Sequence, residues 1–224
     1  MPSRVEERAK TAGRVAPLSS RTKILEVAEA RFARSGFGGV GLRDVAVAAG
    51  LSKSTLFHHF STKEALYVEV IGRVLERVAE RVEPAFACGA PPAERLLRVS
   101  DALVDAFAEH PTTAPLLLRS LFEALPQLEV DAAQQEGAIS VLQRLIGHFQ
   151  DLVREGIAAR AFREVSVPDT TQTIIGAAVF HFASGELGEQ QFGDVSLFSA
   201  EAVARRRREQ RSFFQRALLF DPAL

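Results

Sequence analysis

The sequence predicts an all-α protein with a small N-terminal helical domain and a larger helical domain behind it. Apolar residues recur at spacings of three and four over most of the chain, which is the period of a helix with one buried face. We find no run that alternates apolar and polar residues as a half-buried strand does, and no internal repeat. One segment, residues 42–60, has the pattern of two short helices joined by a tight turn.

Residues 1–18 carry scattered Arg, Lys and Pro and predict a flexible basic arm. The first helix is expected to begin at Ser19 or Ser20, either of which can cap it, and to end near Gly36. Ile24 begins a series of apolar residues that recur every four positions. These residues share one face of the helix.

The two helices that follow are expected to form a helix-turn-helix. Val45, Ala46 and Ala49 form the buried side of the first one, and Gly50 stands where a sharp turn needs a positive φ. Ser52 is placed to cap the second helix by accepting backbone N–H bonds. A second helix held in this way presents its outer face to the major groove of duplex DNA.

The outer face of that second helix follows from helical geometry. Leu56 points inward, and Ser54 and His58 lie about 200° around the helix from it. Hydroxyls, an imidazole, a cation and a ring suit contacts to base edges, thymine methyls and phosphates. The candidate DNA-binding residues are Arg43, Ser52, Lys53, Ser54, Thr55, Phe57, His58, His59 and Lys63.

The next helix is expected to begin with a capping box, in which Ser61 is the N-cap and Glu64 lies three positions later. Lys63 then falls in its first turn. Free N–H groups at a helix start, together with a lysine, predict a clamp for a DNA phosphate.

Residues 21–66 resemble the DNA-binding domain of the TetR family of transcriptional regulators. The matching positions are Ala28, Phe32, Gly36-Phe37, Val45-Ala46, Ala49-Gly50, Leu51-Ser52-Lys53, Thr55-Leu56-Phe57, His59-Phe60 and Lys63-Glu64. The resemblance implies a three-helix DNA-binding head on an all-α, dimeric body that binds a small ligand. Two departures stand out: Val40-Gly41 replace a frequent threonine or serine pair, and Phe57 stands where a tyrosine is common.

The rest of the chain predicts helices throughout, about nine in the whole protein. The expected domains are the arm at 1–18, the helix-turn-helix domain at 19–66 and the ligand-binding and dimerisation domain at 67–224. The helices of the last domain run from Thr62 toward Pro84, from Pro92 to Pro111, through Leu116 to Phe122, over 132–155, from Pro168, and from Ser199 to near Asp221. The glycines at 185, 188 and 193 predict a flexible connection.

The body holds most of the 16 phenylalanines of a chain with one tyrosine and no tryptophan. The family resemblance implies a ligand cavity among its helices. The candidate ligand-binding residues are Phe107, His110, Leu118, Phe122, Phe149, Phe180 and His181. The alternative for each phenylalanine is that it only fills the core, and His110 can serve a helix end instead.

Charge is divided unevenly between the two domains. Residues 1–66 contain 11 Lys or Arg against 6 Asp or Glu, a net +5, and residues 67–224 contain 16 against 22, a net −6. A basic head on an acidic body confines the attraction for DNA phosphates to one end of the molecule.

The last two helices are the candidate homodimer interface. Gly176, Ala177 and Ala178 allow close approach of two helices, and large side chains of the last helix supply apolar area, namely Phe213, Phe214, Leu218 and Leu219. We interpret the Arg205–Arg208 run as a solvated face that pairs with Glu201 and Glu209; the alternative is a second nucleic-acid patch.

The composition argues against several other classes of protein. Cys88 is the single cysteine, so neither an intrachain disulfide nor a thiolate metal cluster is expected, and no apolar run approaches 18 residues. We therefore expect a cytoplasmic protein without cofactor or metal. An enzyme built on His58-His59 is disfavoured, because adjacent helical residues point about 100° apart.

These observations predict a ligand-responsive transcriptional regulator that is not an enzyme. We expect a repressor that binds a palindromic operator in double-stranded DNA as a homodimer and is released by a small, largely apolar effector. The alternatives are a DNA-binding protein of the same fold without an effector, and an activator. The sequence identifies neither the effector nor the operator.

Overall fold

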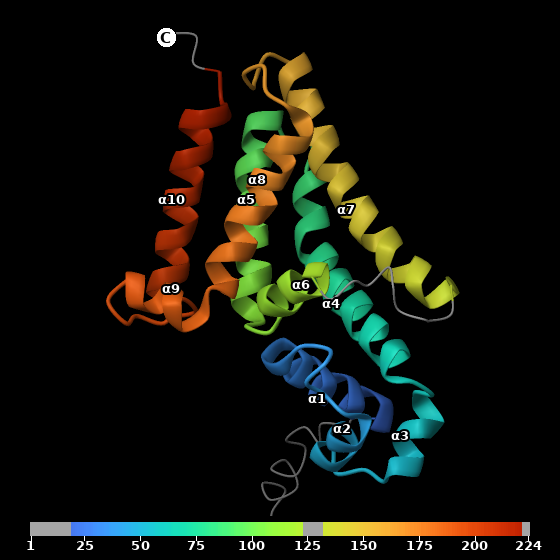
Figure 1. Ribbon diagram of the computed structural model, residues 1–224. Helices are drawn as coiled ribbons and strands as arrows, with labels where there is room; N and C mark the ends of the chain where they lie inside the picture. Colours follow the sequence, from blue (N-terminus) through green and yellow to red (C-terminus); the bar gives the residue numbers. More distant parts are fainter. Residues whose placement is uncertain (1–18, 123–131, 221–224) are drawn as a thin grey trace, which may run out of the picture.

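The computed structural model describes residues 19–122 and 132–220, with side chains from 136 onward in the second range, and within these residues the regular elements are helices (Figure 1). They are α1 (Ser20–Ser35), α2 (Leu42–Ala48), α3 (Lys53–His59), α4 (Lys63–Phe86), α5 (Pro92–Glu109), α6 (Thr113–Phe122), α7 (Ala132–Ala158), α8 (Val167–Ala183), α9 (Gly185–Gln191) and α10 (Ala200–Leu218). The expected arm at 1–18 and the expected end of the last helix near Asp221 lie outside the described residues. The all-α prediction is confirmed.

The first three helices form the head, and the start of α4 completes its core. Ser19 caps α1, as predicted, by accepting a bond from the backbone N–H of Thr22. Phe32 of α1 is fully buried, and its ring meets the ring of Tyr67 of α4 edge-on at a centroid distance of 4.9 Å. The head therefore depends on a residue of the helix that leaves it.

Helix α4 runs from the head into the body (Figure 1). Its apolar stripe of Leu66, Val70, Val74 and Val78, four residues apart, is buried along its whole length. The helix continues two residues past Pro84, farther than expected, because a proline in the last turn gives up only one backbone bond. The same rod is thus packed against both parts of the molecule.

In the body, α5 and α7 pack against α4, α8 packs against α5, α6 and α7, and α10 packs against α5 (Figure 1). Leu96, Val99, Leu103 and Phe107 form the buried face of α5. None of the helices in the described ranges is both long and apolar enough to cross a membrane.

Two local predictions are wrong. Thr62 rather than Ser61 is the N-cap of α4, since the Thr62 hydroxyl accepts the bond from the Ala65 N–H at 3.1 Å. The connection expected over the glycines at 185, 188 and 193 contains the seven-residue helix α9, which the sequence did not predict. Ser199 caps α10 as expected.

The interpretation of the arginine run on α10 is also wrong. Arg207 forms an ion pair with Asp105 of α5, and Arg206 donates a hydrogen bond to the carbonyl oxygen of Ala177 on α8 at 2.6 Å. Neither pairs with Glu201 or Glu209. Arg206 and Arg207 therefore face the body. Their ion pair and hydrogen bond hold α10 on the body, in addition to its buried apolar residues.

Candidate nucleic-acid interface

The turn between α2 and α3 has the predicted geometry. Gly50 adopts φ +68°, a value that costs other residues strain, and Leu51 donates its backbone N–H to the carbonyl of Ala46 at 2.9 Å. Leu56 of α3 is fully buried on the opposite side of the helix from its solvent face. The turn and this anchor fix the orientation of α3 on the head.

Ser52 caps α3 as predicted. Its hydroxyl accepts the backbone N–H of Thr55 at 3.1 Å and lies 2.8 Å from the hydroxyls of both Ser54 and Thr55. The cap therefore holds three hydroxyl groups together at the start of α3. A helix start with free N–H groups and hydroxyls is suited to binding a phosphate.

The outward face of α3 combines charge, imidazole and ring. Lys53, Ser54 and His58 are exposed, and the Phe57 ring is 41% exposed. The Lys53 ammonium lies 5.3 Å from the centroid of that ring, an arrangement that favours an extended lysine along the surface. Arg43 on α2 is exposed as well, and His59 is half-buried.

Lys63 has a partner inside the head that the sequence did not reveal. Its ammonium donates to the backbone carbonyl of Phe37 at 2.9 Å and lies 4.2 Å from the centroid of the Phe37 ring. Lys63 thus ties the start of α4 to the segment between α1 and α2. The spacing of 26 residues explains why a local capping pattern did not show this contact.

A polar junction joins the head to the body. Glu29 of α1 is 7% exposed, and both of its carboxylate oxygens accept bonds from Arg77 of α4, at 2.7 and 3.1 Å. Thr112, between α5 and α6, donates to the same carboxylate at 2.6 Å, and the hydroxyl of Thr113 accepts a bond from Arg77 at 3.1 Å. Three separate segments therefore meet at one buried charge.

The electrostatics of this junction favour the ionised carboxylate. Burial alone raises the pKa of Glu29, but the hydrogen bonds from Arg77 and Thr112 outweigh it and hold the pKa below its ordinary value. The pKa of His110, the C-cap of α5, is lowered by burial and by the charge of Arg77. Sequence reasoning missed the junction, since a glutamate inside an apolar helical pattern resembles an ordinary surface residue.

The candidate ligand-binding residues do not gather around one cavity within the described part of the chain. Phe107 packs against Phe182, and Phe149 packs against Phe86 near the far end of α4, both deep in the core. The remaining candidates lie nearer the surface: His110, Leu118 and His181 are half-buried, and Phe122 and Phe180 are exposed.

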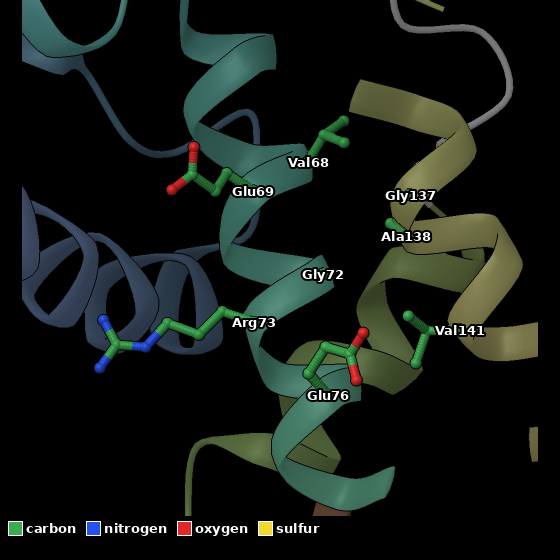
Figure 2. Close-up of a pocket in the computed structure, with 8 residues that line it drawn as sticks. All are labelled: Val68, Glu69, Gly72, Arg73, Glu76, Gly137, Ala138 and Val141. Atoms are coloured by element: carbon green, nitrogen blue, oxygen red, sulfur yellow. The ribbon is translucent and has the colours of Figure 1, made fainter. Parts of the chain in front are cut away.

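The hollow that Figure 2 shows is a groove between α4 and α7. It has a volume of about 270 Å³, and Val68, Ala138 and Val141 form its apolar wall. Gly72 on α4 brings the two helices close, since a Cβ there would lie 3.7 Å from that of Ala138. Glu69 and Arg73 point from the other side of α4 toward the head in this view (Figure 2).

Two sequence profiles match the chain. The profile of bacterial regulatory proteins of the tetR family matches residues 24–70, and that of the tetracyclin repressor-like C-terminal domain matches residues 92–212, which is more than half of the chain. The chain belongs to the TetR family. It is therefore a DNA-binding transcriptional regulator, and the resemblance stated for residues 21–66 is confirmed.

Several relatives of the chain are transcriptional repressors. The chain is 28% identical to the repressor KstR2 of Mycolicibacterium smegmatis over 151 residues, 66% of this chain and 69% of the relative. It is 34% identical to KstR2 of Mycobacterium tuberculosis over 92 residues, which span 46% of that relative.

Solved structures share the fold. The ketosteroid transcriptional regulator KstR2 of Mycobacterium tuberculosis superposes with a TM-score of 0.66 at 22% identity, over 91% of this chain and 96% of that one. AibR in complex with isovaleryl coenzyme A and operator DNA gives 0.70 at 14% identity, over 87% and 97%. The arrangement of a helical head on a helical body is thus that of known TetR regulators.

Proposed function

We propose that this regulator represses transcription by binding a palindromic operator as a homodimer, and that a small, largely apolar effector releases it. The observation that carries the proposal is the outward face of α3, which the turn at Gly50 and the buried Leu56 hold rigidly. Its exposed Lys53, Ser54 and His58 provide a cation, a hydroxyl and an imidazole on one surface. Such a helix fits the major groove, where base edges present donors and acceptors.

The surface of α8 and α10 supports the homodimer. Phe180 on α8 is 65% exposed and Phe213 on α10 is 57% exposed, far more than isolated core-forming rings usually are. Gly176 has open space where a Cβ would stand, so a second helix can approach α8 closely. A second copy that covers this face places two heads on one duplex, with half-sites about 34 Å apart or a multiple of that.

We propose Arg43, Ser52, Lys53, Ser54, Thr55, Phe57, His58, His59 and Lys63 as the DNA-binding residues. Exposed Ser54 and His58 are assigned to base edges. Ser52 and Thr55, which bond one another, are assigned to phosphate at the helix start. Lys63 keeps two of its three N–H donors after its bond to Phe37 and can share the ammonium with a phosphate.

We propose that the effector binds among the seven candidate residues named from the sequence. A ligand that reaches Phe107 or Phe149 has to open the packed core, whereas His110, Leu118 and His181 are already partly accessible. We propose that a ligand bound between the body helices tilts α4, and with it the head, because the buried stripe of α4 packs against both. Only a ligand that binds the tilted state better has this effect.

One set of measurements tests the function. In vitro selection from random duplexes should return a palindrome, and sedimentation with that duplex should give two chains per site. A thermal-shift screen then seeks the effector among apolar metabolites such as ketosteroids, with isovaleryl coenzyme A as a charged probe that carries a short apolar chain, and each hit is added to the operator complex. Selection of sites without symmetry would contradict the proposed homodimeric recognition.

The packed core favours the alternative of a DNA-binding protein without an effector. Phe107 and Phe149 are almost fully buried, and the groove of Figure 2 opens on the surface. In that case no compound of the screen changes operator affinity, although the palindrome and the two-chain stoichiometry persist. A reporter gene behind the operator distinguishes repression from activation in either case.

A further inference from the structure

A group of cationic and imidazole side chains comes together where α8 and α10 meet, next to Phe192 after α9. Helix α10 stands on the opposite side of the body from α7 (Figure 1). Arg205 and Arg206 belong to α10, and His181 belongs to the last turn of α8. The Phe192 ring, just after α9, contacts two of them: the guanidinium carbon of Arg205 lies 4.4 Å and the His181 ring 5.8 Å from its centroid.

Three nitrogen atoms of this group are buried without a hydrogen-bond partner among the described residues. They are Nε2 of His181, Nη2 of Arg205 and Nε of Arg206. Buried polar atoms are nearly always paired, and an unpaired guanidinium is among the costliest groups to bury. The arrangement is therefore incomplete as it stands.

No carboxylate within the described ranges forms an ion pair with Arg205 or Arg206, whereas Arg207 and Arg211 on the same helix are paired with Asp105 and Asp101. Arg206 reaches only the backbone carbonyl of Ala177. Burial, together with the charges of Arg206 and Arg205, lowers the pKa of His181 to about 4, so its imidazole is neutral at pH 7. Positive charge thus accumulates where no negative charge balances it.

We propose that Arg205, Arg206 and His181 form an anion site that takes a carboxylate or a phosphate group. Guanidinium N–H groups bind such planar or tetrahedral anions by charge-assisted hydrogen bonds, and Nη2 of Arg205 and Nε of Arg206 supply one unpartnered donor from each arginine. The anion has two possible sources, a small molecule in solution or an acidic side chain of a second copy. The second source rests on the proposed homodimer, since the site adjoins its face on α8 and α10.

Inorganic phosphate is the probe for the site. Thermal midpoints of the full chain are compared in phosphate and in chloride at equal ionic strength, for the wild type, the double variant Arg205→Gln/Arg206→Gln and the control Arg208→Gln, which changes an exposed arginine of the same helix. Saturating phosphate should raise the midpoint of the wild type and of the control by about 3 °C or more, and leave the double variant unchanged. An equal rise in all three overturns the site for free phosphate.

Sedimentation velocity distinguishes the two sources. If a second copy supplies the carboxylate, the dimer dissociation constant rises at least about tenfold in the double variant, and phosphate weakens the wild-type dimer by competition. If the anion is a free molecule, the dissociation constant stays unchanged while the phosphate shift remains. Absence of both effects refutes the anion site but leaves the proposed homodimer standing, because the dimer itself is measured.

A third variant guards against a misfolded double variant. Arg206→Met keeps the volume of the side chain and removes the buried cation, so its midpoint in chloride, at a chain concentration low enough for the monomer, should equal or exceed that of the wild type. A midpoint clearly below that of the wild-type monomer in both buffers shows instead that the bond to Ala177 is what Arg206 provides, and it overturns the proposal.

Discussion

The head and the body carry two exposed helical surfaces that differ in kind. On α3 the open side carries Lys53, Ser54 and His58, whereas on α8 and α10 it carries Phe180 and Phe213. A polar surface keeps its hydration until a charged partner replaces it, but exposed rings gain most by leaving water. The same all-helical fold thus carries one surface that we propose for DNA and another that we propose for a second copy of the chain.

The largest expected effect comes from placing charges on the apolar surface of α8 and α10. Phe180→Asp/Phe213→Asp should give a monomer whose operator binding falls to the non-specific level, a loss of about 10³-fold or more. Sedimentation and operator titration measure the two effects. Leu121→Asp changes an equally exposed leucine on α6 and serves as the control. A double variant that remains dimeric would place the interface elsewhere.

A variant of the polar junction tests whether the head and the body unfold as one cooperative unit. Arg77→Met leaves the buried Glu29 without its cation, and removal of one partner from a buried pair costs about 3–5 kcal/mol. Chemical denaturation should show this loss in a single transition. The control Arg98→Met breaks an exposed pair with Glu94 and should leave the free energy of unfolding nearly unchanged. Two separate transitions would mean that head and body unfold independently.

The polar surface is tested by its sequence preference. Ser54→Ala and His58→Ala should leave folding unchanged, because both side chains point away from the core, and should relax base preference by about 1–3 kcal/mol at the contacted positions. Site selection with each variant gives the preference. Unaltered selected sites would shift base reading to Arg43 or Thr55.

The two lysines separate charge from structure within the head. Lys53→Ala should reduce the slope of log affinity against log salt by about one unit without a change in thermal midpoint. Lys63→Ala should lower the midpoint too, because it removes the bond to Phe37, which contributes about 1 kcal/mol. If the slope is unchanged for Lys63→Ala, its role is confined to the head itself.

The smallest expected effect is on the pH dependence of the folding stability. The folded protein holds the pKa of His181 at about 4, against 6.5 for a free histidine, so protonation favours the unfolded chain. His181 therefore destabilises the fold as the pH falls from about 6.5 to 4, and His181→Asn should lose less stability than the wild type over that window. His58→Asn, on the exposed face, is the control. Parallel stability curves for wild type and His181→Asn would contradict the burial of this imidazole.

Local rules predicted the head well. The positive φ at Gly50 and the caps at Ser19, Ser52 and Ser199 depend only on residues a few positions away. The error at the start of α4 has the same local origin, because Ser61 and Thr62 are both good N-caps and the sequence does not choose between them.

Contacts between segments distant in the sequence could not be predicted from local patterns. Arg207 meets Asp105 across 102 positions, and Glu29 meets Thr112 across 83, so no periodicity marks either pair. Helix α9 was missed because two of its seven residues are glycine, the weakest helix former after proline, and only the fold around it holds them in a helix. The DNA-binding and effector residues remain predictions, since geometry alone does not show what touches them.

Helix α4 also sets a rule for building hybrid regulators. A cut at residue 66, between the domains expected from the sequence, falls inside this helix and separates Tyr67 from the rings of Phe32 and Phe37. A head transplanted with that boundary leaves behind part of its own core as well as Arg77. A transferable head therefore ends beyond Arg77, and its new host has to supply hydroxyls where Thr112 and Thr113 stand.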